Sequence, residues 1–302
     1  MAWCRARNTR TTSFQEYFVS SDIEKLINRL EVKKLDKYLF SGLSPKRPAR
    51  VFGGQVLAQA LNAAIRTVDS SRLAHSMHAY FLRPGDPSKQ IIYHVDPIRD
   101  GKSFTTRNVT AKQDGIAIFS SSISFHMEEA GLAHHMPMPE VPPPEGLESD
   151  FERWTRLAQE HPGKIDSPRT EAIERKAVQP RDYLNPQPQE PERQLWFRAL
   201  GDLGDDPRLH QTLLAFMSDY ALLGAALLPH PYSGIEKELQ SASLDHAIWF
   251  HRPFRADEHL LYCLDSPVSG GGRGFSRGSF YTRDGLLVAS TAQESLQRVR
   301  QD

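Results

Sequence analysis

The chain has 302 residues, enough to form one large domain or two moderate ones. Its 37 basic and 37 acidic residues cancel and are scattered along the sequence, which argues against a nucleic-acid-binding protein. The longest nearly apolar run, Tyr220 to Leu228, is too short to cross a bilayer. The two cysteines, Cys4 and Cys263, form neither a disulfide framework nor a thiolate zinc motif. We therefore expect a folded protein of a reducing compartment that does not span a membrane.

The N-terminal residues 1–20 are predicted to form a flexible tail. Arg5, Arg7 and Arg10 occur there without the apolar stretch of a secretory signal. The cytoplasm is therefore the expected location, with a short mitochondrial presequence as the alternative interpretation of this tail. The chain does not end in a Ser-Lys-Leu-type tripeptide, which disfavours a peroxisomal location but leaves it open.

Two helices and a series of strands are predicted in the first half of the chain. Residues 21–30 form an amphipathic pattern that a Ser-Asp pair can cap, and the glycine pair 53–54 precedes a second helical segment, residues 55–65. This second segment is apolar on nearly all sides, which suits a helix surrounded by other structure. The strand-like segments that follow are separated by Asp-Gly hairpin signals at 100–101 and 114–115.

A proline-rich connector is predicted to divide the chain. Eleven of the 21 prolines fall between Pro137 and Pro191, and such density breaks both helices and sheet ladders. We therefore predict a linker over residues 131–191, between an N-terminal unit, 21–130, and a C-terminal unit, 192–302. One short helix around residues 150–159 is expected to interrupt the linker, because three large apolar residues recur there at helical spacing.

The two units resemble each other. Phe81–Pro84 recurs as Phe250–Pro253, and after the same interval Ile91–Tyr93 recurs as Leu260–Tyr262. The Asp-Gly hairpin signals follow in both copies, so three matches in order indicate an internal duplication. In the second copy the apolar run 220–228 is predicted to be the central helix. One central helix wrapped by an antiparallel β-sheet, twice over, is an α+β architecture.

The chain resembles the type II acyl-CoA thioesterases in three blocks, Val51–Gln55, His75–Gly85 and Leu244–Phe254. The resemblance runs from about residue 22 to 298. It implies a double hot-dog fold, in which two tandem hot-dog units pair their sheets, and hydrolysis of fatty acyl-CoA thioesters to free fatty acid and coenzyme A. It also implies that such protomers associate into a homo-oligomer.

The resemblance implies three catalytic residues. In that family the chemistry is carried by an Asp at the start of the second hot-dog helix, a Ser or Thr just before Leu/Ile-Asp-His, and a Gln on the last strand. The matching positions are Asp219, Ser243 and Gln293. Asp219 would act as the base that activates a water molecule, which Ser243 and Gln293 would orient.

The internal repeat tests whether the fold itself demands these three residues. Aligning the expected helix starts and the repeated strands places Gln55, Ala74 and Ile123 opposite them. Because the first unit cannot supply the same chemistry at these positions, we predict a single active site, which the second unit carries. The structural alternative for Asp219 is a helix N-cap, a position that Asp often occupies.

Two further residues are candidates for contact with the thioester. Backbone N–H groups at a helix start suit a developing oxyanion, and Gly54 offers one without a side chain in the way. His75 could reach the substrate or could be a hydrogen-bonded histidine of the core, and the sequence leaves both interpretations open.

No metal or organic cofactor is expected. His134 and His135 lack a carboxylate at ligand spacing, and Gly270–Gly274 lacks the lysine-serine/threonine ending of a phosphate-binding loop. Gly274–Gly278 spells the G-x-S-x-G of serine hydrolases, but that motif requires a later histidine and none follows His259. We predict a hairpin turn there instead.

The predicted function is therefore hydrolysis of fatty acyl-CoA. A double hot-dog protein that binds acyl-CoA as a regulator, with vestigial catalytic residues, is one alternative. An enoyl-CoA hydratase-type enzyme is another, although the hydratases of this fold pair an Asp with a His on one loop and no such pair is placed here. Release of free thiol from palmitoyl-CoA would support only the first.

Overall fold

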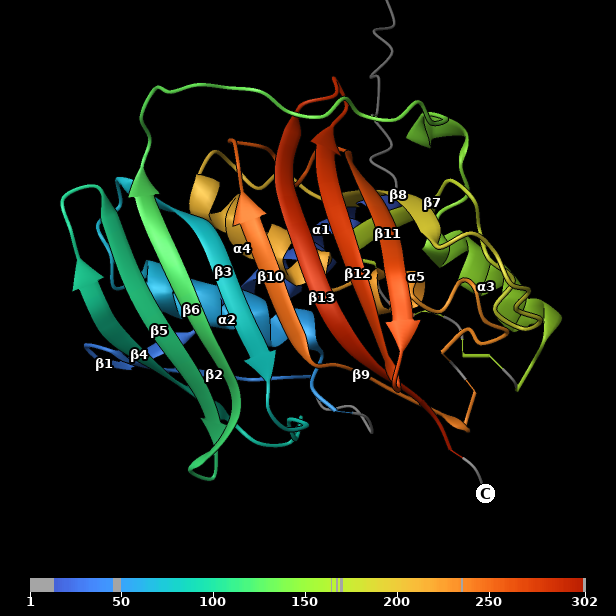
Figure 1. Ribbon diagram of the computed structural model, residues 1–302, viewed down its shortest axis with the longest axis horizontal. Helices are drawn as coiled ribbons and strands as arrows, with labels where there is room; N and C mark the ends of the chain where they lie inside the picture. Colours follow the sequence, from blue (N-terminus) through green and yellow to red (C-terminus); the bar gives the residue numbers. More distant parts are fainter. Residues whose placement is uncertain are drawn as a thin grey trace, which may run out of the picture.

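The described residues of the computed structural model form one antiparallel sheet of 13 strands, with the helices on one side of it (Figure 1). The structure describes residues 14–45, 50–163, 165–166, 168, 171–234 and 236–300, without the side chains of residues 14–21. The strand order is β1-β2-β4-β5-β6-β3-β10-β13-β12-β11-β8-β7, and β9 also pairs with β13. Among the helices so described, none is both long and apolar enough to cross a membrane.

The first unit contains the two predicted helices and the predicted series of strands. Its elements are α1 (Phe14–Leu30), β1 (Lys33–Asp36), β2 (Leu39–Gly42), α2 (Gly53–Ile65), β3 (Arg72–Phe81), β4 (Ile91–Asp100), β5 (Phe104–Gln113) and β6 (Ile116–Met127). The second predicted helix is confirmed as α2, which is buried along nearly its whole length. The expected tail 1–20 is wrong in its boundary, because α1 already begins at Phe14, while Cys4 and the tail arginines lie outside the described residues.

The connector and the second unit complete the sheet. Their elements are η1 (Pro144–Gly146), α3 (Asp150–Glu160), β7 (Ile173–Ala177), β8 (Glu192–Ala199), α4 (Pro207–Ser218), α5 (Leu222–Ala225), β9 (Leu239–Ser243), β10 (Asp245–Phe250), β11 (Leu260–Gly270), β12 (Arg273–Thr282) and β13 (Leu287–Val299). The short helix predicted within the connector is confirmed as α3, and Ser149 and Glu152 form a capping box at its N-terminus. The connector also contains β7, which pairs with β8, so sheet structure begins before the predicted boundary at residue 192.

The two units meet at the centre of the sheet, where β3 pairs with β10. The ladder runs from Asp245 opposite Tyr80 to Trp249 opposite Ser76. Outward from this junction, β6, β5 and β4 on one side match β13, β12 and β11 on the other. This symmetric order agrees with the duplication inferred from the sequence repeats.

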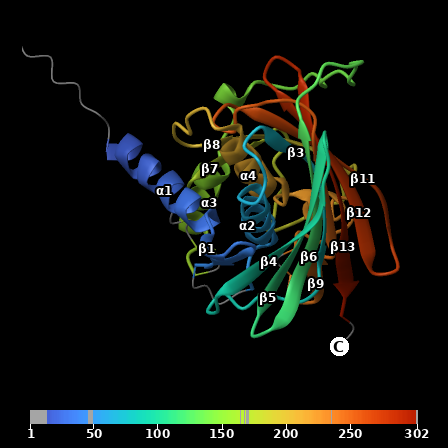
Figure 2. The ribbon, with the colours of Figure 1, turned by 90° about the vertical axis from the view of Figure 1, so that its left-hand side faces the viewer.

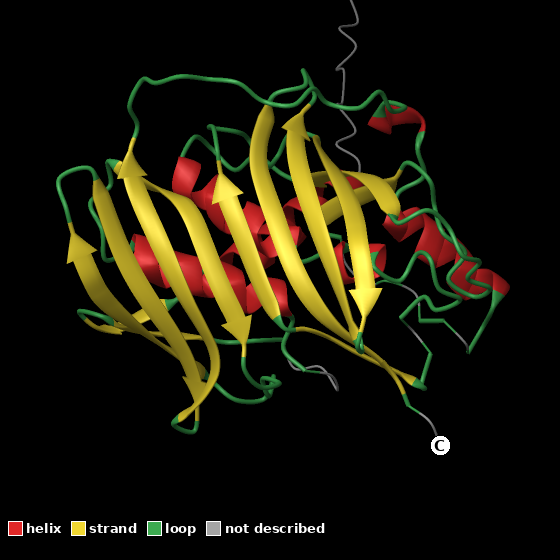
Figure 3. Cartoon of the chain, in the orientation of Figure 1, coloured by secondary structure: helices red, strands yellow, loops and turns green. Residues whose placement is uncertain are grey.

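The central helices α2 and α4 lie side by side against the sheet. Figure 2 shows them between the sheet and the outer helices α1 and α3, and Figure 3 shows the same layering from the sheet side. The largest hydrophobic cluster joins both helices to the inner faces of the strands, with Leu57 and Leu61 of α2 and Leu213 and Met217 of α4 fully buried. One continuous core therefore serves both units.

The central helix predicted at Tyr220–Leu228 is wrong in place and length. The long helix of the second unit is α4, which begins at Pro207 after Asp206, whose side chain accepts a hydrogen bond from the Arg208 N–H at 3.0 Å. Ala221 then adopts a left-handed conformation with φ of 72°, which interrupts the helix, so α5 has only four residues. The apolar run is buried as a turn and a short helix.

The G-x-S-x-G segment Gly274–Gly278 is also placed differently from the prediction. It lies inside β12, and the turn before it is made by Gly271 and Gly272, which have φ of 59° and 73°. A side chain at Gly278 would collide with the ring of Tyr262 on β11. The spacing of the glycines therefore reflects close packing within the sheet.

Candidate active site

Asp219 lies where the central helices of the two units meet. It directly follows α4, and its Oδ2 accepts a hydrogen bond of 2.8 Å from the backbone N–H of Gly54, in the first turn of α2. The residue before α2 is Phe52, whose side chain cannot cap a helix. Asp219 therefore does satisfy a helix N-terminus, but the one that it satisfies belongs to the other unit.

The glycine pair makes this approach possible. A Cβ atom on Gly53 would lie 2.7 Å from Oδ2 of Asp219, and one on Gly54 would collide with the carbonyl oxygen of Phe216 in α4. Because Gly53 and Gly54 have no side chains, the end of α4 and the Asp219 carboxylate can approach the first turn of α2 this closely. The two glycines of the first unit thus determine where the Asp219 carboxylate of the second unit can lie.

The structure brings the three predicted catalytic residues together. Ser243, at the end of β9, donates from Oγ to Oδ1 of Asp219 at 3.4 Å. Gln293, on β13, donates from Nε2 to Oγ of Ser243 at 3.1 Å. The antiparallel pairing of β9 with β13 carries Ser243 and Gln293 to the same place, although they are far apart in the sequence. We call Asp219, Ser243 and Gln293 the Asp219 cluster.

The surroundings of Asp219 suit a base at neutral pH. Burial raises the pKa of its carboxyl to about 7, while the Gly54 N–H, the Ser243 hydroxyl and the charge of Arg50 act in the opposite direction. Arg50 is exposed and donates to the carbonyl oxygen of Ser241, in the middle of β9. A carboxyl with a pKa close to the ambient pH can both accept and return a proton.

Beyond Gln293, the chain of hydrogen bonds continues to His246 and then to Ser218. The ring of His246 is 1% exposed; its Nδ1 lies 2.8 Å from Oε1 of Gln293 and its Nε2 lies 2.9 Å from Oγ of Ser218. Burial lowers the pKa of His246 to about 4, so the ring is neutral at physiological pH. Sequence reasoning assigned no role to either residue, although both adjoin predicted motifs, Ser218 before Asp219 and His246 within Leu244–His246.

Two other residues that the sequence singled out are placed elsewhere or differently. His75 on β3 contacts Ser124 through Nε2 at 2.8 Å, and its ring packs near Phe104 and His126, so the structure does not bring it to the Asp219 cluster. Ser276, within the G-x-S-x-G segment, stands opposite Gln293 in the β12–β13 ladder. It is buried, and its hydroxyl has no hydrogen-bond partner among the described residues.

A cavity of about 340 Å³ opens on the side of α1 and α3, and its lining includes Tyr220, the residue after Asp219. Phe52, Phe216 and Tyr220 form an aromatic wall of this cavity, with Phe52 and Tyr220 4.8 Å apart between ring centroids. Arg50 and Arg175 also line it, together with the carboxyl groups of Asp150 and Glu171, and Arg175 pairs with Asp150 at 3.3 Å. The cavity therefore combines an aromatic wall with charges of both signs. Across the part of the chain that the structure describes, no group of three or more histidine, cysteine or acidic side chains is arranged to hold a metal.

Comparison with known proteins adds to this geometry. A family model described as acyl-CoA thioesterase N-terminal domain matches residues 43–126, and one described as acyl-CoA thioesterase matches residues 166–296. Acyl-coenzyme A thioesterase 8 of Mus musculus is 40% identical over 296 residues, which cover 93% of this chain and 92% of the mouse protein.

Solved structures show the same likeness. The acyl-CoA thioesterase II TesB2 of Mycobacterium marinum aligns with a TM-score of 0.75 at 40% identity, covering 91% of this chain and 98% of that one. A hot-dog protein of unknown function from Alicyclobacillus acidocaldarius aligns with a TM-score of 0.71 at 17% identity, covering 92% of this chain and 99% of that one. The second match bears on the fold alone. The predicted double hot-dog architecture is confirmed.

Proposed function

This chain belongs to the acyl-CoA thioesterase family, and we propose that it hydrolyses fatty acyl-CoA with a water molecule that Asp219 activates. Family membership establishes that the chain is an enzyme that hydrolyses acyl-CoA thioesters. The proposal adds the residues that carry out the reaction. The observation that supports it most is the hydrogen-bonded line from Gly54 through Asp219 and Ser243 to Gln293.

Each member of the Asp219 cluster has a distinct part in the proposed reaction. Asp219 takes a proton from the water while the water oxygen attacks the thioester carbon. Ser243 and Gln293 hold that water by hydrogen bonds. When the tetrahedral intermediate collapses, the carbon–sulfur bond breaks, and the proton on Asp219 passes to the departing thiolate of coenzyme A. Acid and thiol leave, and the carboxylate is regenerated.

Gly54 has a more specific part than the sequence suggested. Its N–H donates to Asp219 in the structure, so we propose that it first holds the carboxylate toward the site. Once Asp219 has taken up a proton, its oxygen becomes a weaker acceptor, and the N–H is released to stabilise the oxyanion. His75 is left out of the proposed site, because its contacts lie elsewhere.

The nucleophile in this proposal is water, without an acyl-enzyme. The Ser243 hydroxyl faces Asp219 and Gln293, and among the described residues it has no histidine partner of the kind that activates a catalytic serine. Rapid mixing with palmitoyl-CoA should therefore show no burst of thiol release. An acyl group found on Ser243 by mass spectrometry of the quenched reaction would overturn this part of the proposal.

We propose that the cavity lined by Phe52, Phe216 and Tyr220 receives part of the substrate. Its aromatic wall suits the apolar portions of an acyl-CoA, and the exposed guanidinium of Arg50 suits the phosphates. The substitution Phe216→Ala removes a ring from the wall and enlarges the cavity, and it leaves the side chains of the Asp219 cluster unchanged. We expect it to shift the preferred acyl length in an assay from butyryl- to palmitoyl-CoA. An unchanged length profile would exclude this wall from acyl recognition.

A single assay tests the catalytic proposal. Thiol release from palmitoyl-CoA, followed with a thiol-reactive dye, distinguishes hydrolysis from acyl-CoA binding alone and from enoyl-CoA hydration. Ser243→Ala and Gln293→Ala should each lower turnover by roughly 10- to 1,000-fold, because each removes a donor that holds the water. Combined with a substitution at Asp219, their effects should not multiply, because all three residues serve one water. Association into a homo-oligomer and a cytoplasmic location stay predictions.

A further inference from the structure

The side chain of Gln293 has two ends, and its function depends on which end faces Ser243. A side-chain amide has a carbonyl acceptor and an NH₂ donor of nearly the same shape. In the structure Nε2 faces Ser243 and Oε1 faces His246, whose ring is buried behind it. The hydrogen bond between His246 and the far end of the Gln293 amide therefore determines whether Ser243 meets a donor or an acceptor.

Two hydrogen-bond networks satisfy these contacts, and they run in opposite directions. In the first, Ser218 donates to Nε2 of His246, Nδ1–H donates to Oε1 of Gln293, the amide donates to Ser243, and Ser243 donates to Asp219. In the second, Nε2–H of His246 donates to Ser218, whose hydroxyl then donates to the Ala215 carbonyl 3.0 Å away. Nδ1 must then accept from a reversed amide, and Ser243 must donate to Gln293 and turn away from Asp219.

We propose that His246 is a positioning residue, which carries its proton on Nδ1 and thereby holds the Gln293 amide with its NH₂ group toward Ser243. The ionised Asp219 favours this network, because a carboxylate is the strongest acceptor at the end of the line. This inference rests on the proposed function of the Asp219 cluster and adds to it the residue that sets the direction of its hydrogen bonds.

The first unit shows that the fold does not require this polar pair. There Met77 on β3 stands opposite Ile123 on β6, and both are completely buried. The sequence repeat places His246 and Gln293 at the same ladder position, one residue beyond the paired Ala247 and Ala292. An apolar pair thus satisfies this position in one copy, so a hydrogen-bonded pair in the other serves a purpose other than packing.

Two matched substitutions test the contributions of the two ring nitrogens of His246 separately. In His246→Asn the side-chain NH₂ occupies the place of Nδ1 and can still donate to Gln293. In His246→Gln the amide reaches the place of Nε2 and keeps only the contact with Ser218. We expect kcat of His246→Asn to stay within about tenfold of the wild type. His246→Gln should lose roughly 10- to 100-fold in kcat with little change in KM, as residues that orient a catalytic group do.

A double substitution tests whether His246 acts through Gln293. If it does, His246→Gln combined with Gln293→Ala should be no slower than Gln293→Ala alone, within about twofold. Multiplication of the two losses would overturn the proposal. Circular dichroism and thermal unfolding confirm that each variant is folded. A fully active Asp219→Asn would instead refute the proposed function and leave the hydrogen-bond direction to be tested by the following measurement.

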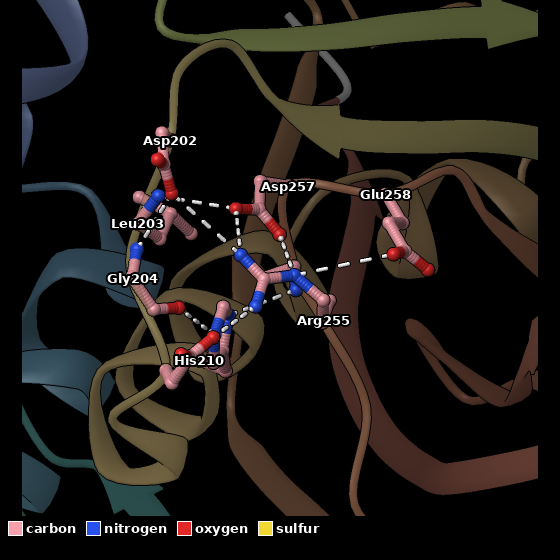
Figure 4. Close-up of polar contacts among 9 residues, drawn as sticks. Asp202, Leu203, Gly204, His210, Arg255, Asp257 and Glu258 are labelled. Carbon is pink, nitrogen blue, oxygen red and sulfur yellow. Dashed lines mark hydrogen bonds and ion pairs between the residues drawn. The ribbon is translucent and has the colours of Figure 1, made fainter.

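The proton position is measurable in the unmodified enzyme by ¹⁵N NMR of labelled histidines. His210 provides an internal control, since its Nδ1 accepts from the Ala256 N–H at 3.0 Å and its Nε2 lies 3.0 Å from the carbonyl oxygen of Gly204, as Figure 4 shows in part. We expect the proton of His210 on Nε2 and that of His246 on Nδ1. A proton on Nε2 of His246 would overturn the inference.

Discussion

The two hot-dog units share one sheet and the same strand order, but they differ in the residues at the positions of the Asp219 cluster. Opposite the Asp219 cluster, the first unit has Ile65, Ala74 and Ile123. All three are buried apolar residues, and none can act as a base. The first unit nevertheless contributes the N–H of Gly54, without which Asp219 would lose its closest partner. In the proposed mechanism, one copy of the duplication supports the site and the other supplies the catalytic side chains.

This comparison corrects one alignment made from the sequence. Gln55 was placed opposite Asp219 because the second helix was expected to begin near that residue. Superposing the observed N-caps of the two central helices, Phe52 of α2 and Asp206 of α4, places Ile65 opposite Asp219 instead. The predicted inequality of the two units does not depend on this shift, because neither Gln55 nor Ile65 can accept a proton from water at neutral pH.

The largest expected effect comes from Asp219→Asn, which keeps the size of the side chain but removes the base. Turnover should fall by roughly 10²- to 10⁴-fold, the usual share of general-base catalysis. Asp257→Asn is a matched control, because Asp257 also accepts from a backbone N–H, that of Leu203 at 3.0 Å, but belongs to the Arg255 ion-pair cluster of Figure 4. The control should keep wild-type turnover per folded molecule. Equal losses in both variants would contradict the assignment.

The next prediction gives the second unit the apolar pair of the first. His246→Met combined with Gln293→Ile reproduces Met77 and Ile123 at the same ladder position. The double variant should fold, because the first unit already packs this pair, and should lose roughly 100- to 1,000-fold in turnover, since it lacks the donor to Ser243. Circular dichroism and thiol release measure the two outcomes. An active double variant would remove Gln293 from the reaction.

The dependence of activity on pH tests the carboxyl directly. Since burial raises the pKa of Asp219 to about 7, the fraction of ionised base falls below neutral pH. We expect kcat/KM to decrease about tenfold for each pH unit below 7 and to level off above it. The residual activity of Asp219→Asn should lack this limb. A profile flat between pH 5 and 8 in the unmodified enzyme would exclude Asp219 as the base.

Much of this comparison could be predicted from the sequence. The duplication, the buried helix α2 and the cluster of Asp219, Ser243 and Gln293 follow from residue order and family resemblance. The contact of Asp219 with Gly54 could not be predicted, because it joins two units and depends on how closely the helices pack. The position of α4 was missed since its pattern is interrupted by polar residues that are buried in the structure, such as Gln211, which hydrogen-bonds the backbone of Ala74.

The same carboxyl should make the folded state less stable as pH rises. The pKa of Asp219 is raised in the folded chain from an ordinary value of 3.8 to about 7, so its proton is bound more tightly there than in the unfolded chain. The stability that this proton contributes is present below about pH 4 and is lost as pH rises through 7. Asp219→Asn should therefore be more stable than the wild type at pH 8, by on the order of 1 to 4 kcal/mol, and nearly equal to it at pH 4.

Chemical denaturation at both pH values measures this difference. Asp257→Asn should change stability in the opposite direction at pH 8. Although burial alone would raise the pKa of Asp257, its hydrogen bonds with Arg255 and the Leu203 N–H lower it below the ordinary value, so its ionised form stabilises the fold. A loss of stability at pH 8 in Asp219→Asn would show that the carboxylate is better solvated than its surroundings indicate.

The smallest effect is expected from Gln55→Ala, in the first turn of α2. Gln55 is buried and donates from Nε2 to the carbonyl oxygen of Leu43 at 3.1 Å and to Oγ of Ser44 at 2.7 Å. Its removal should loosen the segment before α2, which lines the cavity, and raise KM more than it lowers kcat. Turnover should stay within about tenfold of the wild type, because the Gly54 N–H and the Asp219 cluster are untouched. If this variant is as slow as Asp219→Asn, the first unit takes part in the chemistry and the division between a supporting and a catalytic copy is wrong.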